Sequence, residues 1–220
     1  LIAAIADIEG IERIRYMTSH PKDMDDELIA AHGEIPKLMP FMHLPVQSGS
    51  DKILKEMNRK HTGDHYREIM AKLRKARPDI ALASDFIVGF PSETEQDFED
   101  TMQLVRDVNY AHAYSFKYSA RPGTPAANMQ NLVPEAVKSE RIQRLQALID
   151  AQRLAFNQAY LDKTVPVLFD RQGDKPDHFL GRTPYNQSVH VTSNSALLGK
   201  VVPVKLTAAN ALSMTGEIAV

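Results

Sequence analysis

The sequence predicts an α/β domain followed by a small all-β barrel. Over about the first 160 residues, branched and aromatic runs alternate with amphipathic helical patterns, which is typical of βαβ units around a parallel sheet. Beyond that point short apolar runs are separated by Gly, Pro, Asn, Asp and Ser. We therefore predict two domains, residues 1–158 and 159–220.

The first domain opens with one helical and one extended pattern. Residues 1–6 are apolar and have no N-cap residue in front of them, so we expect the end of a helix that began in a longer protein. Residues 11–17 alternate like a strand. Residues 23–32 carry acidic side chains where a helix begins, which favours a helix there.

Three further strands are predicted, each followed by a helical pattern: 41–46, 80–88 and 112–118. Ser50 and Asp51 cap a short helix, and Thr62 begins a longer helix that ends before Pro78. A capping box at residues 92–95 opens the next helix. The last pattern of the domain is a long helix over residues 134–160.

The second domain is predicted to contain five short strands: 164–169, 179–183, 188–191, 200–206 and 215–220. Five strands in about 60 residues suit a closed or partly closed barrel of the size that binds oligonucleotides. Its six Lys and Arg against five Asp and Glu give a charge of +1. The barrel as a whole therefore does not attract RNA strongly.

Composition excludes several kinds of site. The chain has no cysteine, so it cannot itself supply disulfides, thiolate zinc ligands, cysteine nucleophiles or cysteine ligands to iron-sulfur clusters. Its eight histidines show no metal-ligand spacing, and no metal site is predicted. The sequence shows neither a long apolar run nor a secretory signal, so we expect a cytoplasmic protein without a membrane partner.

Polar residues follow four successive predicted strands, at 18–20, 47–50, 84–89 and 118–124. In a parallel barrel the carboxyl ends of all strands lie on one face, where active sites are built. These segments therefore predict a ligand site, although polar residues at strand ends are also typical of ordinary loops.

Four sequence motifs that overlap these segments resemble later-strand motifs of the radical-SAM methylthiotransferases. They read RYMTSHP (15–21), HLPVQSGS (43–50), DFIVGFPSET (85–94) and RPGTPA (121–126). The last 60 residues resemble the TRAM domain that ends these enzymes. Within the family, residues 47–50 and 116–119 are more similar to the tRNA enzymes than to the paralogues that act on a ribosomal protein.

The resemblance implies an α/β fold with the last four βα units of a partial radical-SAM barrel, followed by a TRAM-like, OB-like barrel. It implies methylthiolation at C2 of N6-isopentenyladenosine beside the tRNA anticodon. The implied cofactors are S-adenosylmethionine and two 4Fe-4S clusters, with all cluster ligands outside this chain. The implied partners are the tRNA anticodon stem-loop and an electron donor, and the full-length protein is expected to be a monomer. This chain alone is expected to be inactive.

Six residues are expected to contact S-adenosylmethionine: Gln47, Ser48, Asp85, Val88, Gly89 and Arg121. Gln47 and Ser48 suit the ribose or the methionine moiety, and the strand that ends at Gly89 suits the adenine. Family sequences commonly read GFPGET where this chain has Ser92, which questions whether the backbone there needs glycine.

Six residues are expected to contact RNA: Arg59, Lys60, Arg171, Lys175, Arg182 and Tyr185. Two other functions stay open at this point. The chain could be a non-enzymatic RNA-binding module whose α/β domain is a scaffold. An ordinary (β/α)8 metabolic enzyme is the third, but neither a phosphate-binding glycine loop nor paired catalytic carboxylates stand out.

Overall fold

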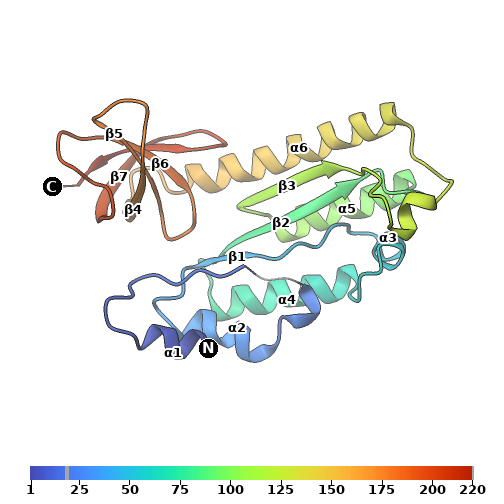
Figure 1. Cartoon of the computed structure of the whole chain (residues 1–220), viewed down its shortest axis with the longest axis horizontal. Helices are drawn as coiled ribbons and strands as arrows, with labels where there is room; N and C mark the ends of the chain where they lie inside the picture. The colour runs from blue at the N-terminus through green and yellow to red at the C-terminus, as the bar shows by residue number, and fades with distance from the viewer. Residues whose placement is uncertain (18–19, 220) are drawn as a thin grey trace.

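The computed structural model describes residues 1–17 and 20–219. The long helix α6, Glu135–Gln158, runs alongside the sheet of an α/β domain, and a β-barrel lies at the carboxyl-terminal end of this helix (Figure 1). The strand-end segment expected at 18–20 falls largely outside the described residues. Within them, no helix is both long and apolar enough to cross a membrane.

The α/β domain is built on a parallel sheet of β1 (Phe41–His43), β2 (Ala81–Val88) and β3 (His112–Lys117), in that order. His43 pairs with Ala83, and Ala83 pairs with His112. All three strands run in the same direction, so their carboxyl ends meet at one edge of the sheet. This confirms the parallel α/β fold.

The regular strand expected over residues 11–17 is absent from the described residues, and that prediction is wrong. Ile14 forms only an isolated parallel bridge with Leu38, through Ile14 N–H to Lys37 O (2.7 Å) and Met39 N–H to Ile14 O (3.0 Å). The segment that pairs with it cannot extend the ladder, because residues 36–37 form a turn and Pro40 has no N–H to donate. Arg13 and Arg15 donate side-chain hydrogen bonds to barrel carbonyls, which ties this segment to the other domain.

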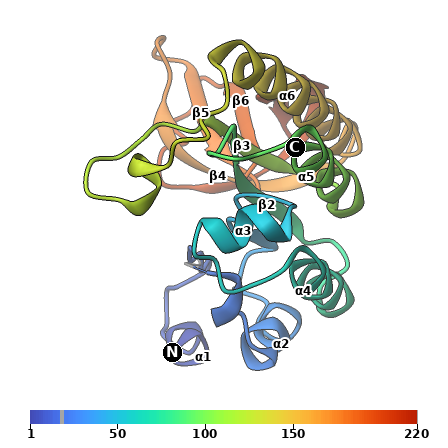
Figure 2. The ribbon, with the colours of Figure 1, turned by 90° about the vertical axis from the view of Figure 1, so that its right-hand side faces the viewer.

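Helices pack on one side of the sheet. They are α2 (Asp26–Glu34), α4 (Gly63–Ala76), α5 (Glu95–Val108) and α6, whereas α1 (Ile2–Ala6) precedes them and α3 (Asp51–Glu56) lies at the carboxyl ends of the strands (Figure 1). Figure 2 shows α4, α5 and α6 along the same side of β1–β3. The core between the layers is apolar because alternate strand residues, such as Met42, Leu82 and Phe86, point toward the helices.

Side-chain caps begin the helices as the sequence indicates, with one shift. Ser50 accepts from Ile53 N–H, and Thr62 accepts from His65 N–H. The capping box of α5 is formed by Thr94 and Asp97, so the prediction at residues 92–95 is wrong by two positions. Short 3-10 helices lie at Pro21–Asp23 and Pro125–Asn128.

The barrel consists of β4 (Thr164–Gln172), β5 (His178–Arg182), β6 (Ser188–Thr192), β7 (Val201–Ala209) and β8 (Met214–Ile218). The strands close in the order β4-β5-β6-β8-β7, which confirms the five-stranded barrel. Its core includes the fully buried Val167, Phe169, Val189 and Leu206. The domain boundary at residue 158 stays a prediction.

Candidate functional site

The sheet has an inner face, turned away from the helices, that carries His43, Asp85, Ile87, His112, Tyr114 and Phe116. Register places Asp85 beside Tyr114 and Ile87 beside Phe116, and alternation along each strand keeps these side chains on one face. Tyr114 is 54% exposed and Phe116 is 52% exposed. Large aromatic side chains on an open sheet face indicate a surface on which a ring can pack.

The polar centre of the inner face is a carboxylate held by a histidine. His43 Nε2 lies 2.9 Å from Asp85 Oδ1, and the Asp85 side chain is 23% exposed. The ring of His112 lies on the neighbouring strand, and burial, followed by the charge of Arg153, lowers its pKa to about 4. Asp85 is therefore a positioned acceptor for an amine or a hydroxyl group, next to a neutral histidine.

The carboxyl ends of β1 and β2 are joined by backbone hydrogen bonds at a left-handed turn. Gln47 has φ of +77°; its N–H donates to Asp85 O, and its carbonyl accepts from Ile87 N–H, both at 2.9 Å. Gly89 has φ of +72°, and a Cβ there would lie 2.4 Å from Lys138 Cγ. Gly89 therefore permits an approach of chains that other residues would block.

Ser48 and Val88 are fully buried next to this edge of the sheet. The Ser48 hydroxyl lies 3.2 Å from Thr101 Oγ1 on α5 and accepts from Ser50 N–H. Val88 packs in the core, and its carbonyl accepts from Tyr118 N–H at 2.8 Å. Both side chains therefore stabilise the edge of the sheet from inside the protein. Arg121, in contrast, is exposed in the loop after β3.

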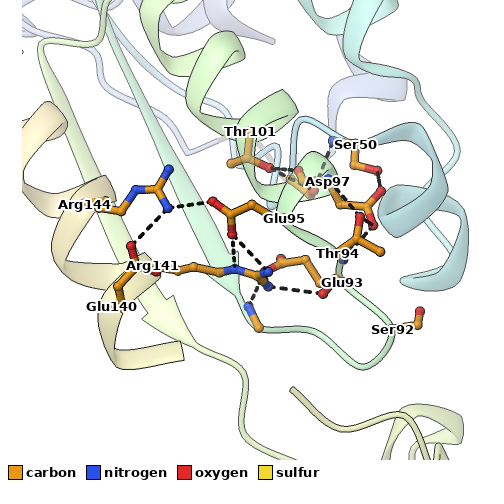
Figure 3. Close-up of polar contacts among 12 residues, drawn as sticks. Ser50, Ser92, Glu93, Thr94, Glu95, Asp97, Thr101, Glu140, Arg141 and Arg144 are labelled. Atoms are coloured by element: carbon orange, nitrogen blue, oxygen red, sulfur yellow. Dashed lines mark hydrogen bonds and ion pairs between the residues drawn. The ribbon is translucent and has the colours of Figure 1, made fainter. Parts of the chain in front are cut away.

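A buried ion pair fixes the turn between β2 and α5 to α6 (Figure 3). Arg141 Nη1 donates to Glu93 Oε1 at 2.8 Å, and the two side chains are 5% and 2% exposed. The same Glu93 oxygen accepts from Gly89 N–H at 2.8 Å. The position of Gly89 at the end of β2 therefore depends on a residue of α6.

Two polar groups near the carboxyl ends of the strands have no hydrogen-bond partner among the described residues. They are the ring nitrogens of His61 and the hydroxyl of Tyr118. His61 is 6% exposed, its ring lies 5.1 Å from that of His20, and burial lowers its pKa to about 4. Buried polar atoms of this kind are what a polar ligand at the strand ends would satisfy.

The six residues expected to contact RNA do not form one cluster. Arg59 and Lys60 lie after α3, where Lys60 binds Asn58. Arg171 and Lys175 are exposed on the barrel. Arg182 and Tyr185 line a cleft between the two domains. The Tyr185 ring is already packed on Tyr160 at 4.8 Å, and its hydroxyl donates to Asp79.

Sequence reasoning missed most of the inner face. The predicted site depends on the residues that follow each strand, whereas most of the inner face is formed by alternate residues within the strands. His112, Tyr114 and Phe116 recur at every second position of a single run, which was the available signal. The polar partners His43 and Asp85 are 42 residues apart, and only the register of β1 with β2 brings them together.

The chain matches known families over most of its length. Residues 1–105 match the Radical SAM superfamily, and residues 158–219 match the TRAM domain. Over 219 residues it is 58% identical to the tRNA-2-methylthio-N(6)-dimethylallyladenosine synthase of Rickettsia felis and 57% identical to that of Rickettsia rickettsii (strain Sheila Smith). These alignments cover 99% of this chain and 49% of each relative, so the chain spans about half the length of the curated relatives it matches.

Among solved structures, coproporphyrinogen III oxidase from Escherichia coli, a Radical SAM enzyme, is similar with a TM-score of 0.53 and 16% identity. The similarity covers 75% of this chain and 45% of that chain, and it concerns the fold alone. It agrees with the parallel α/β sheet described above. Residues 1–105 are thus similar to the Radical SAM superfamily and residues 158–219 to TRAM domains, and the whole chain is similar to about half the length of tRNA-2-methylthio-N(6)-dimethylallyladenosine synthases.

Proposed function

We propose that this chain is part of a radical-SAM enzyme that methylthiolates C2 of N6-isopentenyladenosine beside the tRNA anticodon. The observation that carries the proposal is the 58% identity along the chain to a synthase named for this modification. The open inner face, with a positioned carboxylate among aromatic side chains, agrees with it. The whole protein is proposed to be a cytoplasmic monomer that receives electrons from a separate donor.

S-adenosylmethionine fits the carboxyl ends of β1 and β2. Asp85 offers a carboxylate to an amine or a ribose hydroxyl, and the partly exposed Gln47 stands at the left-handed turn beside it. When bound, this cofactor would supply two things: the radical that abstracts a hydrogen atom, and the methyl group that is transferred. The unsatisfied Tyr118 hydroxyl and His61 nitrogens lie near these strand ends and provide further polar contacts.

The 4Fe-4S clusters do not fit the residues of this chain. Thiolate ligands need cysteine, and the 220 residues contain none. We propose two clusters in the complete protein, with ligands contributed from outside this chain. This chain contributes one side of the binding site. Tyr114 and Phe116 exclude water from the inner face, and Asp85 orients a polar ligand on that face.

Of the six residues expected to contact the cofactor, Gln47 and Asp85 are partly exposed and suit direct roles. Ser48, Val88 and Gly89 are buried and would act by supporting those two. Arg121 is exposed beyond β3 and suits a carboxylate or a phosphate at the outer end of the site.

The test uses the complete protein, reconstituted under anaerobic conditions, with Asp85→Asn as the variant. We expect Asp85→Asn to weaken binding of S-adenosylmethionine, measured by isothermal titration calorimetry, and to lower formation of the 2-methylthio nucleoside, measured by mass spectrometry of digested tRNA. Asp64→Asn is the matched control, because that carboxylate is 92% exposed on α4. Unmodified tRNA with the intact protein, or equal effects of both variants, would refute the proposal.

A further inference from the structure

A cleft of about 500 Å³ lies between the two domains, at the amino-terminal ends of β1 and β3. It is distinct from the carboxyl ends where the cofactor is proposed to bind. Figure 1 shows the barrel beside these amino-terminal ends, where α6 finishes. The cleft is formed by residues 13–15 after α1, by the last turns of α6 and by β4 and β5 of the barrel.

Four arginines line this cleft: Arg13, Arg15, Arg153 and Arg182. Among the residues that the structure describes, none of the four forms an ion pair with a carboxylate, while Arg141 and Arg144 on the same helix as Arg153 are both paired. Asp170 is the one acidic residue of the lining. Four arginines and one aspartate give the cleft a formal charge of +3, in a chain whose net charge is -2.

Neutral backbone carbonyls hold these side chains in place. Arg13 donates to Arg182 O at 3.1 Å and to Pro166 O at 2.9 Å. Arg15 donates to Thr183 O at 2.7 Å, and Arg153 donates to Leu212 O at 3.1 Å. A carbonyl orients a guanidinium group without cancelling its charge, and each guanidinium group has five N–H donors. The cluster is therefore ordered and still electropositive.

The four arginines also affect one another. Burial, followed by the charges of Arg13 and Arg182, lowers the pKa of Arg15 to about 10. Burial is also the largest cause of the lowered pKa of Arg153, with Arg182 contributing to it. Like charges held this close without an ion-paired carboxylate are stabilised by a bound anion, and the planar guanidinium fork matches phosphate.

We propose that this interdomain cleft binds phosphate groups of the RNA backbone, with Tyr114 as an adjoining surface for a base. The inference rests on the proposed function for the identity of the RNA. A free small phosphate shares the same chemistry, but the 54% exposed ring of Tyr114 in the lining favours a nucleic acid. From His112 to Tyr118 the strand direction spans roughly 20 Å at ~3.3 Å per residue, so the cleft would hold nucleotides away from the one at the carboxyl ends.

The first test measures binding of a fluorescein-labelled anticodon stem-loop RNA by fluorescence anisotropy. In the double variant Arg153→Gln/Arg182→Gln we expect about tenfold weaker binding, and a salt slope reduced by about 1.4, since each phosphate contact on a single strand contributes about 0.7. The double variant Lys200→Gln/Lys205→Gln is the matched control, because it removes the same two charges from exposed positions of the barrel outside the cleft. Equal losses in the control and the arginine variant would overturn the proposal.

Asp170→Asn provides a variant that does not depend on removing an arginine. Because it takes away the one acidic side chain of the lining, it should tighten RNA binding severalfold. Unchanged or weaker binding by Asp170→Asn would contradict an anion site in this cleft. Thermal melts of all variants show whether a loss of binding reflects a loss of folding.

A second arm separates RNA from a free phosphate. Inorganic pyrophosphate, added at matched ionic strength, should displace the RNA only weakly, and Tyr114→Ala should weaken RNA binding without changing pyrophosphate binding. Strong pyrophosphate binding that depends on Arg182, with RNA binding unaffected, would overturn the RNA proposal. These measurements need no catalysis, so a protein that binds RNA here and fails to modify it would refute the proposed function alone.

Discussion

Replacing Arg141 with methionine should destabilise the α/β domain strongly, because it leaves a buried carboxylate without its counter-charge. Arg141 donates to the carboxylate of Glu93 at 2.8 Å and to its backbone carbonyl at 3.1 Å. Without Arg141, the Gly89 N–H is the remaining donor to that carboxylate among the described residues. The Arg141 guanidinium carbon lies 5.6 Å from the centre of the Phe98 ring, and the flexible methionine side chain fills part of the same space, which limits the effect of a cavity.

The expected cost is about 3–5 kcal/mol in the free energy of unfolding, the range for a buried ion pair that loses one partner. Arg144→Met is the matched control on the same helix. Arg144 also lies over Phe98 and pairs with Glu95, Glu99 and Glu140, but those side chains are 56%, 37% and 53% exposed. Exposed pairs contribute at most about 1 kcal/mol. The two variants should therefore differ by roughly 2 kcal/mol or more, the gap between these two ranges.

Urea denaturation followed by circular dichroism measures both costs at two pH values. Burial already raises the pKa of Glu93, and losing Arg141 raises it further, so the variant can relieve its unpaired charge by protonation as the pH falls. The deficit of Arg141→Met relative to wild type should shrink from pH 8 to pH 5. A deficit below about 1 kcal/mol at pH 8, or one that grows on acidification, would refute the reasoning.

Three further predictions concern single positions. Ser92 has φ of +67°, so Ser92→Gly should raise the free energy of unfolding by about 1 kcal/mol in urea denaturation, and a decrease would contradict backbone strain there. A Cβ on Gly49 would lie 2.4 Å from Asp100 O, so Gly49→Ala should cost about 2 kcal/mol or more, and an unchanged melting temperature would refute this close approach. The pKa of His61 is about 4, below its unfolded value of about 6.5. The free energy of unfolding should therefore fall as the pH drops below about 6.5, by about 1.4 kcal/mol per pH unit, because the unfolded chain binds a proton that the folded protein does not. His61→Gln should flatten that part of the stability profile and the half-exposed His65→Gln should not, and equal profiles would count against the assignment.

The elements that sequence predicted correctly are those whose signals are local. Apolar alternation marked β2 and β3, and Ser50 and Thr62 marked helix starts, because an N-cap needs only its own side chain and the N–H groups that follow. The five barrel strands were recoverable for the same reason. Each is a short apolar run bounded by turn residues.

The elements that it missed depend on partners distant in the chain. Residues 11–17 alternate like a strand, but the segment around Leu38 with which they pair follows a turn, so the pairing is limited to one bridge. Ser92 occupies a left-handed backbone conformation that its side chain disfavours, and its N–H donates to Asn131 O at 2.7 Å. No local pattern contains Asn131, so the sequence around Ser92 could not show that this conformation is retained.

The proposed cofactor site and the proposed phosphate site share one sheet, and this explains why the domains have to be held together firmly. His112 lies at the amino-terminal end of β3 in the arginine-lined cleft, and its strand ends beside the unsatisfied Tyr118. RNA held by both domains would be placed along β3 only if the barrel is fixed relative to the sheet. Arg13 and Arg15 provide that fixation through carbonyls of β4 and of the turn after β5. The same arginines would then serve both as the link between domains and as the positive charge that an RNA backbone meets.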